Sequence, residues 1–239
     1  MALTRAPAPT PPSTVRLRPR HLYGLSPVGV FGCGVVGLAN GAFWSLGPLY
    51  ATGRGFDLTS LATFMGLTVL GGALAQWPFG RLSDRRDRRQ VIALACGLSV
   101  IAGLALAIAG GLWPRAIFPL AMLFGAAAFP LYALCVAHAN DMMAKDEFVE
   151  ASSGLLLANG IGSAIGPIFA SLAMSGLGPS GLFVYTAGIH ALMLAFVLHR
   201  IRQRAPAPPE ERGSFAPVSE SSPAVITLDP RSDEATPAP

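Results

Sequence analysis

The sequence predicts an all-helical integral membrane protein with six transmembrane helices. Only 13% of the 239 residues are charged, whereas 52% are hydrophobic. A water-soluble domain usually carries about 25% charged residues, so this chain has too few charges to cover a surface that faces water. Between residues 27 and 200 the charges gather in short connectors. The uncharged runs between them are roughly 20 residues long or longer, which is enough to cross a bilayer.

Six apolar runs, uncharged except for Glu150 in the first turn of the fifth, define the expected spans and divide the chain into three parts. The runs are continuous rather than alternating, which favours helices over a barrel. The predicted spans are residues 27–50, 58–79, 91–112, 116–138, 149–174 and 180–199. We therefore expect a basic, Pro-rich N-terminal segment at 1–26, a six-helix domain at 27–200 and a disordered Pro-rich tail at 201–239. Residues 1–20 lack the apolar core of a signal peptide, so the first run counts as a span.

Lys and Arg residues sort between alternate connectors. Two of them, Arg54 and Arg115, lie on one side. The other side holds Arg5, Arg16, Arg18, Arg20, Arg81, Arg85, Arg86, Arg88, Arg89, Lys145, Arg200, Arg202 and Arg204. Because Lys and Arg mark the cytoplasmic face, this asymmetry predicts that both termini are cytoplasmic.

Residues 80–89, GRLSDRRDRR, form the most basic connector between spans. Nucleic-acid binding explains it poorly, because the run is short, contains two aspartates and lies between two spans. The run resembles the signature loop of the major facilitator superfamily, G-x-L-[SA]-D-R-x-G-R-[RK]. The matching positions include Gly80, Asp84, Arg85, Arg88 and Arg89.

One position departs from that signature. Asp87 stands where the N-terminal copy of the loop has Gly, and the form D-R-x-D-R-R resembles the second, C-terminal copy. Residues 25–51 and 132–141 also resemble the C-terminal half of the YcaD-like branch of the superfamily. The chain is therefore similar to one six-helix half of a transporter.

The resemblance implies a fold, a function and partners. Each half in this superfamily consists of two inverted three-helix repeats. A shift of 89 residues aligns Gly71 with Gly160, Pro78 with Pro167 and Leu67 with Leu156. We expect a half-transporter, or a fragment of a longer transporter, in a bacterial cytoplasmic membrane; it moves a small molecule by alternating access, as secondary active transport, and is not an enzyme. Its expected partners are the lipid bilayer, the substrate and a second six-helix half, either another copy or a separate N-terminal half. No cofactor, metal or nucleic acid is expected.

The resemblance also gives the basic loop a role as a gate. Asp84, just beyond the predicted helix, can accept hydrogen bonds from the N-terminal amides of a neighbouring helix. The arginines can pair with acids of the next cytoplasmic connector, of which Asp141 and Glu150 are the candidates. By resemblance, this pairing closes the cytoplasmic side in one state. The alternative is a solvated loop that only sets the topology.

Polar and aromatic residues inside the spans are the candidates for substrate contact. Asn40 and Trp44 lie four residues apart and so share a helix face. Because the first and fourth spans of a half line the substrate path in this family, the resemblance adds Phe129 and Tyr132, with Asn159 from the fifth span. For each amide, the alternative is a hydrogen bond between helices.

The remaining motifs favour structural roles. Gly166 and Pro167 resemble the bending points of helices that rock, and close packing would use the same residues. The three cysteines, Cys33, Cys96 and Cys135, are expected to be small buried hydrophobic residues, since neither a disulfide framework nor a metal site fits their spacing.

Two other functions compete with transport. An assembly or scaffold protein of the membrane would keep the fold without a substrate path. Residues 178–181, GPSG, also match the serine motif of rhomboid proteases. However, His190 lies about 15 Å from Ser180 along one helix, which is too far for a catalytic pair, so proteolysis is a remote third. His190 is expected to be a packed or interfacial histidine.

Overall fold

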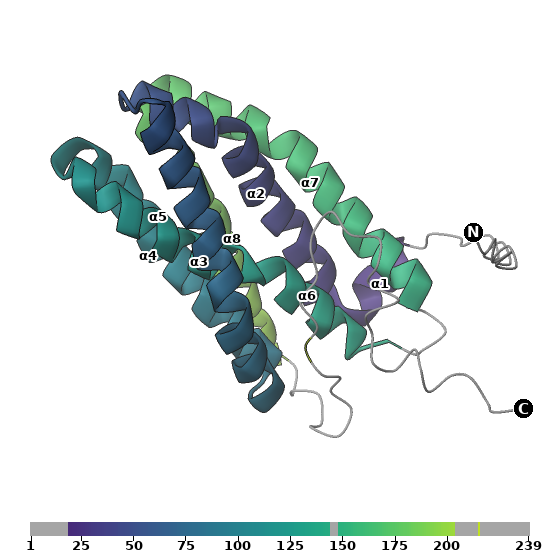
Figure 1. Cartoon of the computed structure of the whole chain (residues 1–239). Coiled ribbons are helices and arrows are strands. Elements are labelled where there is room, and N and C mark those ends of the chain that lie inside the picture. The colour runs from purple at the N-terminus through teal and green to yellow at the C-terminus, as the bar shows by residue number, and fades with distance from the viewer. Residues whose placement is uncertain (1–18, 144–147, 204–214, 216–239) are drawn as a thin grey trace, which may run out of the picture.

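A computed structural model describes residues 19–143, 148–203 and 215, and its secondary structure over these residues is helical (Figure 1). The helices are α1 (Pro19–Leu25), α2 (Pro27–Gly53), α3 (Leu58–Arg85), α4 (Arg88–Leu112), α5 (Ile117–Ala128), α6 (Pro130–Asn140), α7 (Phe148–Leu177) and α8 (Gly181–Gln203). Two short 3-10 turns, η1 (Pro114–Ala116) and η3 (Gly178–Ser180), precede α5 and α8.

Five helical segments in the described residues are long and apolar enough to cross a membrane. They are Pro27–Gly53, Leu58–Arg85, Arg88–Ala109, Ile117–Asn140 and Ala151–Gln203. The last has 53 residues, which as one straight helix would be about 80 Å long, far more than the bilayer core. Instead, η3 divides it into α7 and α8, and Gly178 supplies the positive φ of 66° at that turn. The all-helical membrane fold is confirmed, with six spans counted in this way.

Side-chain caps fix where three of the helices begin. The hydroxyl of Ser26 accepts from the N–H of Gly29 at the start of α2, and the carboxylate of Asp57 accepts from Ser60 at the start of α3. Asp87 caps α4 in the same way. Such caps satisfy N–H groups that have no partner within the helix.

The observed elements differ most from the predicted ones at three places. Helix α3 continues to Arg85, six residues beyond the predicted end at residue 79. Asp84 therefore lies in the last turn of α3, and the expectation that it lies beyond the helix is wrong. The extra turns form because Gly80 and Ser83 still face the bundle and are buried. The short helix α1, within the segment 1–26, was not predicted; its Leu22 is 6% exposed and packs in the core.

The third difference is a break in the predicted fourth span. Pro130 has no N–H to donate, so the carbonyl of Ala126 loses its helical partner and α5 gives way to α6. Phe129 between them keeps helical dihedral angles, φ −71° and ψ −32°, and donates to the carbonyl of Gly125. The two helices together still form one span, Ile117–Asn140.

The packing of the helices follows the expected internal repeat. Helix α2 lies mainly against α7, α3 against α5, and α4 against α8. Exchanging the first three spans for the last three converts the α2–α7 pair into the α5–α3 pair and leaves the α4–α8 pair unchanged. This is the pattern that two inverted three-helix repeats produce. In Figure 1, α2 and α7 run side by side, with α3, α4 and α5 on the other side of α2.

Glycines line both repeat-related contacts, which we call the glycine seams. At each seam glycine the nearest neighbour of an added Cβ would be a carbonyl oxygen of the facing helix. Between α2 and α7 these glycines are Gly37, Gly41, Gly162 and Gly166; between α3 and α5 they are Gly71 and Gly125. Glycine lets the two backbones approach, and the recurring geometry is that of Cα–H···O contacts.

Pro167 adds to one of these seams. A proline at this position removes the helical hydrogen bond to the carbonyl of Ser163, four residues earlier. That freed carbonyl lies against Gly41 of α2. Helix α7 continues through Pro167 to Leu177. The bending role of Gly166 and Pro167 stays a prediction.

The buried side chains form two clusters. One surrounds Cys33, Cys96 and Cys135, which are fully buried, as expected. The other is aromatic and includes Phe124. His190 is fully buried with its ring edge-on to Phe124, at a centroid distance of 6.2 Å, so it is a packed histidine.

Candidate functional site

The basic loop lies between α3 and α4 and is only partly a solvated surface. Arg81, Arg85 and Arg86 are exposed. Arg88 and Arg89, by contrast, are 2% and 5% exposed, because the first turn of α4 directs them into the protein. Two buried guanidinium groups at one end of an apolar bundle need partners close by.

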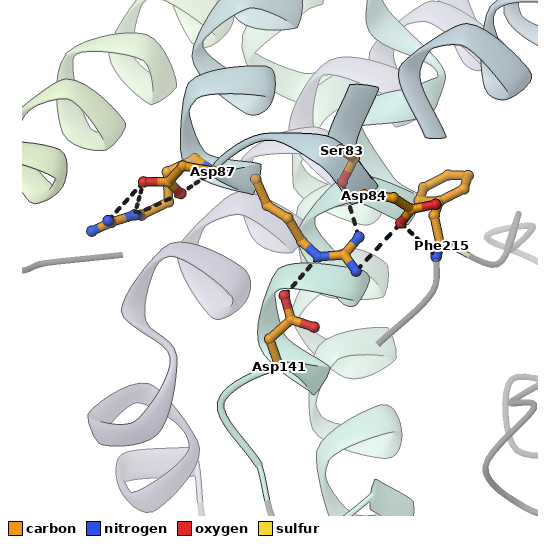
Figure 2. A network of polar contacts seen from close by, with 7 residues as sticks. Ser83, Asp84, Asp87, Asp141 and Phe215 are labelled. Atoms are coloured by element: carbon orange, nitrogen blue, oxygen red, sulfur yellow. Dashed lines mark hydrogen bonds and ion pairs between the residues drawn. The ribbon is translucent and has the colours of Figure 1, made fainter. Parts of the chain in front are cut away.

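Arg88 connects three segments of the chain (Figure 2). Its Nε donates to the Oδ2 atom of Asp141 over 2.6 Å, and its Nη1 donates to the hydroxyl of Ser83 over 2.9 Å. Its Nη2 lies 3.7 Å from Oδ1 of Asp84, four residues earlier. The side chain of Asp141 is only 3% exposed. Arg88 thus joins the end of α3 and the start of α4 to the end of α6, and we call these four residues the Arg88 network.

Asp87 serves as the cap of α4 and as the partner of Arg89. Its Oδ1 accepts from the backbone N–H of Arg89 over 3.0 Å, and its Oδ2 accepts from Nη2 of the same residue over 2.8 Å. Burial raises the pKa of the Asp87 carboxyl, but the hydrogen bonds and charge of Arg89, with the charge of His138, outweigh it, so the pKa lies below its ordinary value. Asp87, which departs from the signature, therefore stabilises the start of α4 and neutralises Arg89.

Asp84 accepts a hydrogen bond from a distant part of the chain. The backbone N–H of Phe215 donates to its Oδ1 over 2.8 Å, beside Arg88 (Figure 2). The expected donor was the N-terminus of a neighbouring helix; the observed donor is a single residue of the segment 201–239. The rest of that segment beyond Gln203, for which disorder is expected, lies outside the described residues, as do the N-terminal residues before Pro19. The side chain of Glu150, the second candidate acid, also lies outside them.

Two of the five substrate-contact candidates lie together at the surface. Trp44 stacks on Phe129, with ring centroids 5.6 Å apart and planes 21° apart. Phe43 supports both rings edge-on, and Gly72 of α3 gives Phe129 its place, because a Cβ there would lie 2.7 Å from Cδ2 of that ring. Trp44 remains 49% exposed. We call Trp44 and Phe129 the aromatic shelf.

The three polar candidates are buried. Asn40 and Tyr132 are each 2% exposed, and Asn159 is 4% exposed. The side-chain amide of Asn159 donates to the carbonyl of Cys33 over 3.3 Å, across the α2–α7 seam. This is the interhelical hydrogen bond that the alternative interpretation expected for it. Their contact with a substrate stays a prediction.

The opposite end of the bundle is tied by a second set of polar contacts. Arg54, after α2, donates to the hydroxyl of Ser180 before α8, and that hydroxyl donates to the carbonyl of Ala107 over 2.6 Å. Alternate connectors therefore gather at opposite ends of the bundle. Ser180 is engaged here, whereas His190 packs against Phe124, so the structure brings no histidine of α8 to this serine.

Comparison with known proteins identifies the family. The sequence profile of the Major Facilitator Superfamily matches residues 29–233. The chain belongs to this superfamily. It is 31% identical over 176 residues to a protein named "Uncharacterized MFS-type transporter YcaD" from Salmonella typhi, an alignment that covers 74% of this chain and 45% of the relative. A relative of the same name from Escherichia fergusonii is 30% identical over 175 residues, with 73% and 44% covered.

Membership of the superfamily has two direct consequences. The chain is an integral membrane protein of a transporter family, and the family points away from enzymatic activity. The chain spans about 45% of the length of the YcaD relatives that it matches. The resemblance of the loop at Gly80–Arg89 to the signature of the superfamily is thus confirmed at the level of the family.

Replacing Asp87 with Gly, the residue of the usual superfamily signature, is expected to lower the free energy of unfolding by about 1 kcal/mol at neutral pH. Glycine is a tolerable cap, so most of the loss comes from the ion pair with Arg89, discounted for solvent screening. Because the pKa of Asp87 is lowered in the folded state, its contribution is present above the unfolded pKa of about 3.9 and vanishes as the pH falls through the folded value.

Unfolding in detergent at pH 7 and at about pH 3 measures this difference. The gap between the Asp87→Gly variant and the wild type should close at the lower pH. Asp87→Asn is the matched control, because asparagine caps helices well but carries no charge. An equal effect of Asp87→Gly at both pH values would contradict the role of the ion pair.

Two parts of the site had weak signals in the sequence. Ser83 was expected only as a signature residue, yet its hydroxyl holds Arg88. Its spacing of three residues from Gly80 was the available signal, since it continues the buried face of α3. Phe215 had no usable signal, because one aromatic residue in a Pro-rich segment indicates neither a helix nor a partner.

Proposed function

We propose that this chain is a half-transporter of the major facilitator superfamily that moves a small molecule by alternating access, as secondary active transport, with a second six-helix half. The second half is another copy or a separate N-terminal half. The proposal rests on the family and on six spans in two repeats. The chain would lie in the cytoplasmic membrane of a bacterium with both termini in the cytoplasm, because Lys and Arg residues gather at that end.

The Arg88 network is the single observation that best supports a gate. It joins the α3–α4 connector to the end of α6 through a guanidinium that is 2% exposed. Buried charges are costly unless they are paired, so the network has two distinct states, made and broken, rather than a range of intermediate ones. In the proposed mechanism the made state closes the cytoplasmic end. Asp84 is its exposed edge, with 39% of the side chain exposed, and would accept the N-terminal N–H groups of a helix from the second half.

The aromatic shelf is the proposed place of substrate contact. Trp44 and Phe129 come from the first and fourth spans, and a stacked pair of rings, of which Trp44 is half-exposed, supplies a large apolar contact area at low entropic cost. Asn40 lies one turn from Trp44 on the same face of α2 and would provide a polar contact if the seam opens. A membrane assembly or scaffold protein would need neither the shelf nor the network.

Transport is tested with proteoliposomes that contain the full chain and are loaded with a bacterial metabolite extract. Mass spectrometry of the lumen before and after incubation should show at least one compound that leaves faster than from liposomes without protein. Asp84→Asn should slow that compound about tenfold or more while leaving the fraction inserted in the membrane unchanged.

Asp57→Asn is the matched control, because Asp57 lies at the other end of the same helix and asparagine keeps its cap. It should transport like the wild type. If the wild type moves no compound, transport by this chain is overturned. Equal transport by Asp84→Asn and the wild type would overturn only the gate.

A further inference from the structure

Phe215 lies against the part of the basic loop that, in the proposed function, contacts the second six-helix half. Its N–H donates to Asp84, and its ring lies over Gly80, one turn earlier on α3. The ring also packs against the cluster that surrounds the three cysteines. Phe215 is separated from the end of α8 at Gln203 by 11 residues of sequence.

The absence of a side chain at Gly80 creates this place. A Cβ at Gly80 would lie 2.5 Å from Cδ1 and 2.9 Å from Cε1 of the Phe215 ring. The flat surface of Gly80 beside Oδ1 of Asp84 therefore accepts an apolar ring together with a backbone N–H donor. The first N–H groups of a helix are donors of the same kind.

We propose that Phe215 occupies the Gly80–Asp84 surface as a built-in competitor of the second six-helix half. This inference rests on the proposed function, because the second half is the partner that would otherwise bind Asp84. While Phe215 is bound, Asp84 accepts the N–H of Phe215 and the ring of Phe215 covers Gly80. Pairing of the halves then requires that Phe215 leave.

Phe215 competes effectively because it belongs to the same chain as its binding surface. A short connection gives the attached residue an effective concentration on the order of millimolar at its site, so even a weak contact stays mostly occupied. The second half must supply enough binding free energy to displace it. The Phe215 contact therefore acts as a threshold for assembly rather than as a permanent block.

Occupancy is tested by cross-linking in the full chain. An added Cβ at Gly80 lies 3.2 Å from Cγ of Phe215. The two Cβ atoms of the double variant Gly80→Cys/Phe215→Cys are therefore about 4.7 Å apart at most, close enough for a disulfide. The native cysteines are fully buried and stay out of the reaction.

A matched control uses the far end of the same helix. Thr59→Cys/Phe215→Cys places the first cysteine about 32 Å along α3 from Gly80. Only the Gly80 pair should form a disulfide quickly under mild oxidation. Replacement of Phe215 by benzoylphenylalanine, which keeps the ring, should photo-cross-link to the peptide that contains Gly80. Failure of both cross-links would overturn the proposed occupancy.

Competition is tested by self-association of the full chain in liposomes, followed by energy transfer between labelled copies. Phe215→Ala should tighten association about tenfold, and Phe215→Tyr, which keeps the ring, should match the wild type. The oxidised Gly80→Cys/Phe215→Cys protein should associate about tenfold more weakly than the same protein after reduction.

Equal association of Phe215→Ala and Phe215→Tyr would overturn the competition. If every variant stays monomeric while the Gly80 pair still cross-links, the competition with a second copy is also overturned. In that case the failure lies in the proposed pairing of halves and not in the position of Phe215.

Discussion

Replacing Arg88 with Met is expected to lower the free energy of unfolding by about 3–5 kcal/mol. The change removes the cation that lies 2.6 Å from the carboxylate of Asp141, whose side chain is only 3% exposed. The hydroxyl of Ser83 loses a charged donor at the same time. Asp84 contributes less, because it is 3.7 Å away and 39% exposed. Chemical unfolding in detergent micelles, followed by tryptophan fluorescence, measures the loss.

A double-mutant cycle separates the ion pair from packing. Arg88→Met/Asp141→Leu removes both charges and fills much of the same volume, so most of the lost stability should return. Arg85→Met, three residues before Arg88 but exposed, should change stability by less than about 0.5 kcal/mol. A loss under about 1 kcal/mol in Arg88→Met would show that the network is loosely held.

The same pair of variants distinguishes stability from gating. The double variant keeps the fold but has no ion pair between the α3–α4 connector and the end of α6. If the Arg88 network closes the cytoplasmic end, transport by the double variant should stay impaired although its stability is restored. Transport that recovers together with stability would assign the network a purely structural role.

The spans were predictable because the length of a run without charges decides whether it can cross a membrane. An uncharged run of about 20 residues has few alternatives to a transmembrane helix, and the six runs required only the positions of charges. The family followed from the loop at residues 80–89, in which the spacing of Gly80, Asp84 and the arginines matches the signature. The buried state of Cys33 followed from its place inside a span.

Other features were not predictable because they depend on contacts between distant segments. The rule that charges end a span placed the end of α3 too early, since Gly80 and Ser83 continue its buried face past Arg81. Helix α1 exists because Leu22 finds a place in the core that only the folded bundle provides. The contact of Phe215 with Asp84 joins residues that are 131 positions apart.

The alignment of the two repeats also failed to predict a contact between helices at one position. The shift of 89 residues pairs Gly71 with Gly160, yet only Gly71 packs against a facing backbone; around Gly160 nothing lies within 4 Å of an added Cβ. The glycine that contacts α2 is Gly162, two residues later. Sequence similarity between repeats thus identified the correct helix but not the correct face.

The different surroundings of Gly160 and Gly162 predict different effects of adding a methyl group. Gly162→Ala should lower the free energy of unfolding by about 2–3 kcal/mol, because the new methyl group would overlap the carbonyl oxygen of Gly34 and lie 2.8 Å from the N atom of Leu38. Backbone atoms of a packed helix cannot move aside as a flexible side chain can. Gly160→Ala on the same helix should leave stability unchanged or raise it by about 0.5–1 kcal/mol, through the better helix propensity of alanine.

The repeat extends the prediction to the other seam. If α3–α5 and α2–α7 are equivalent contacts, Gly71→Ala, which would overlap the carbonyl of Met122, should be about as destabilising as Gly162→Ala. Gly66→Ala is its control on α3, because nothing lies within 4 Å of that position. Thermal unfolding of the four variants in one detergent makes the comparison. A large loss at one seam with none at the other would mean that the two contacts are not equivalent.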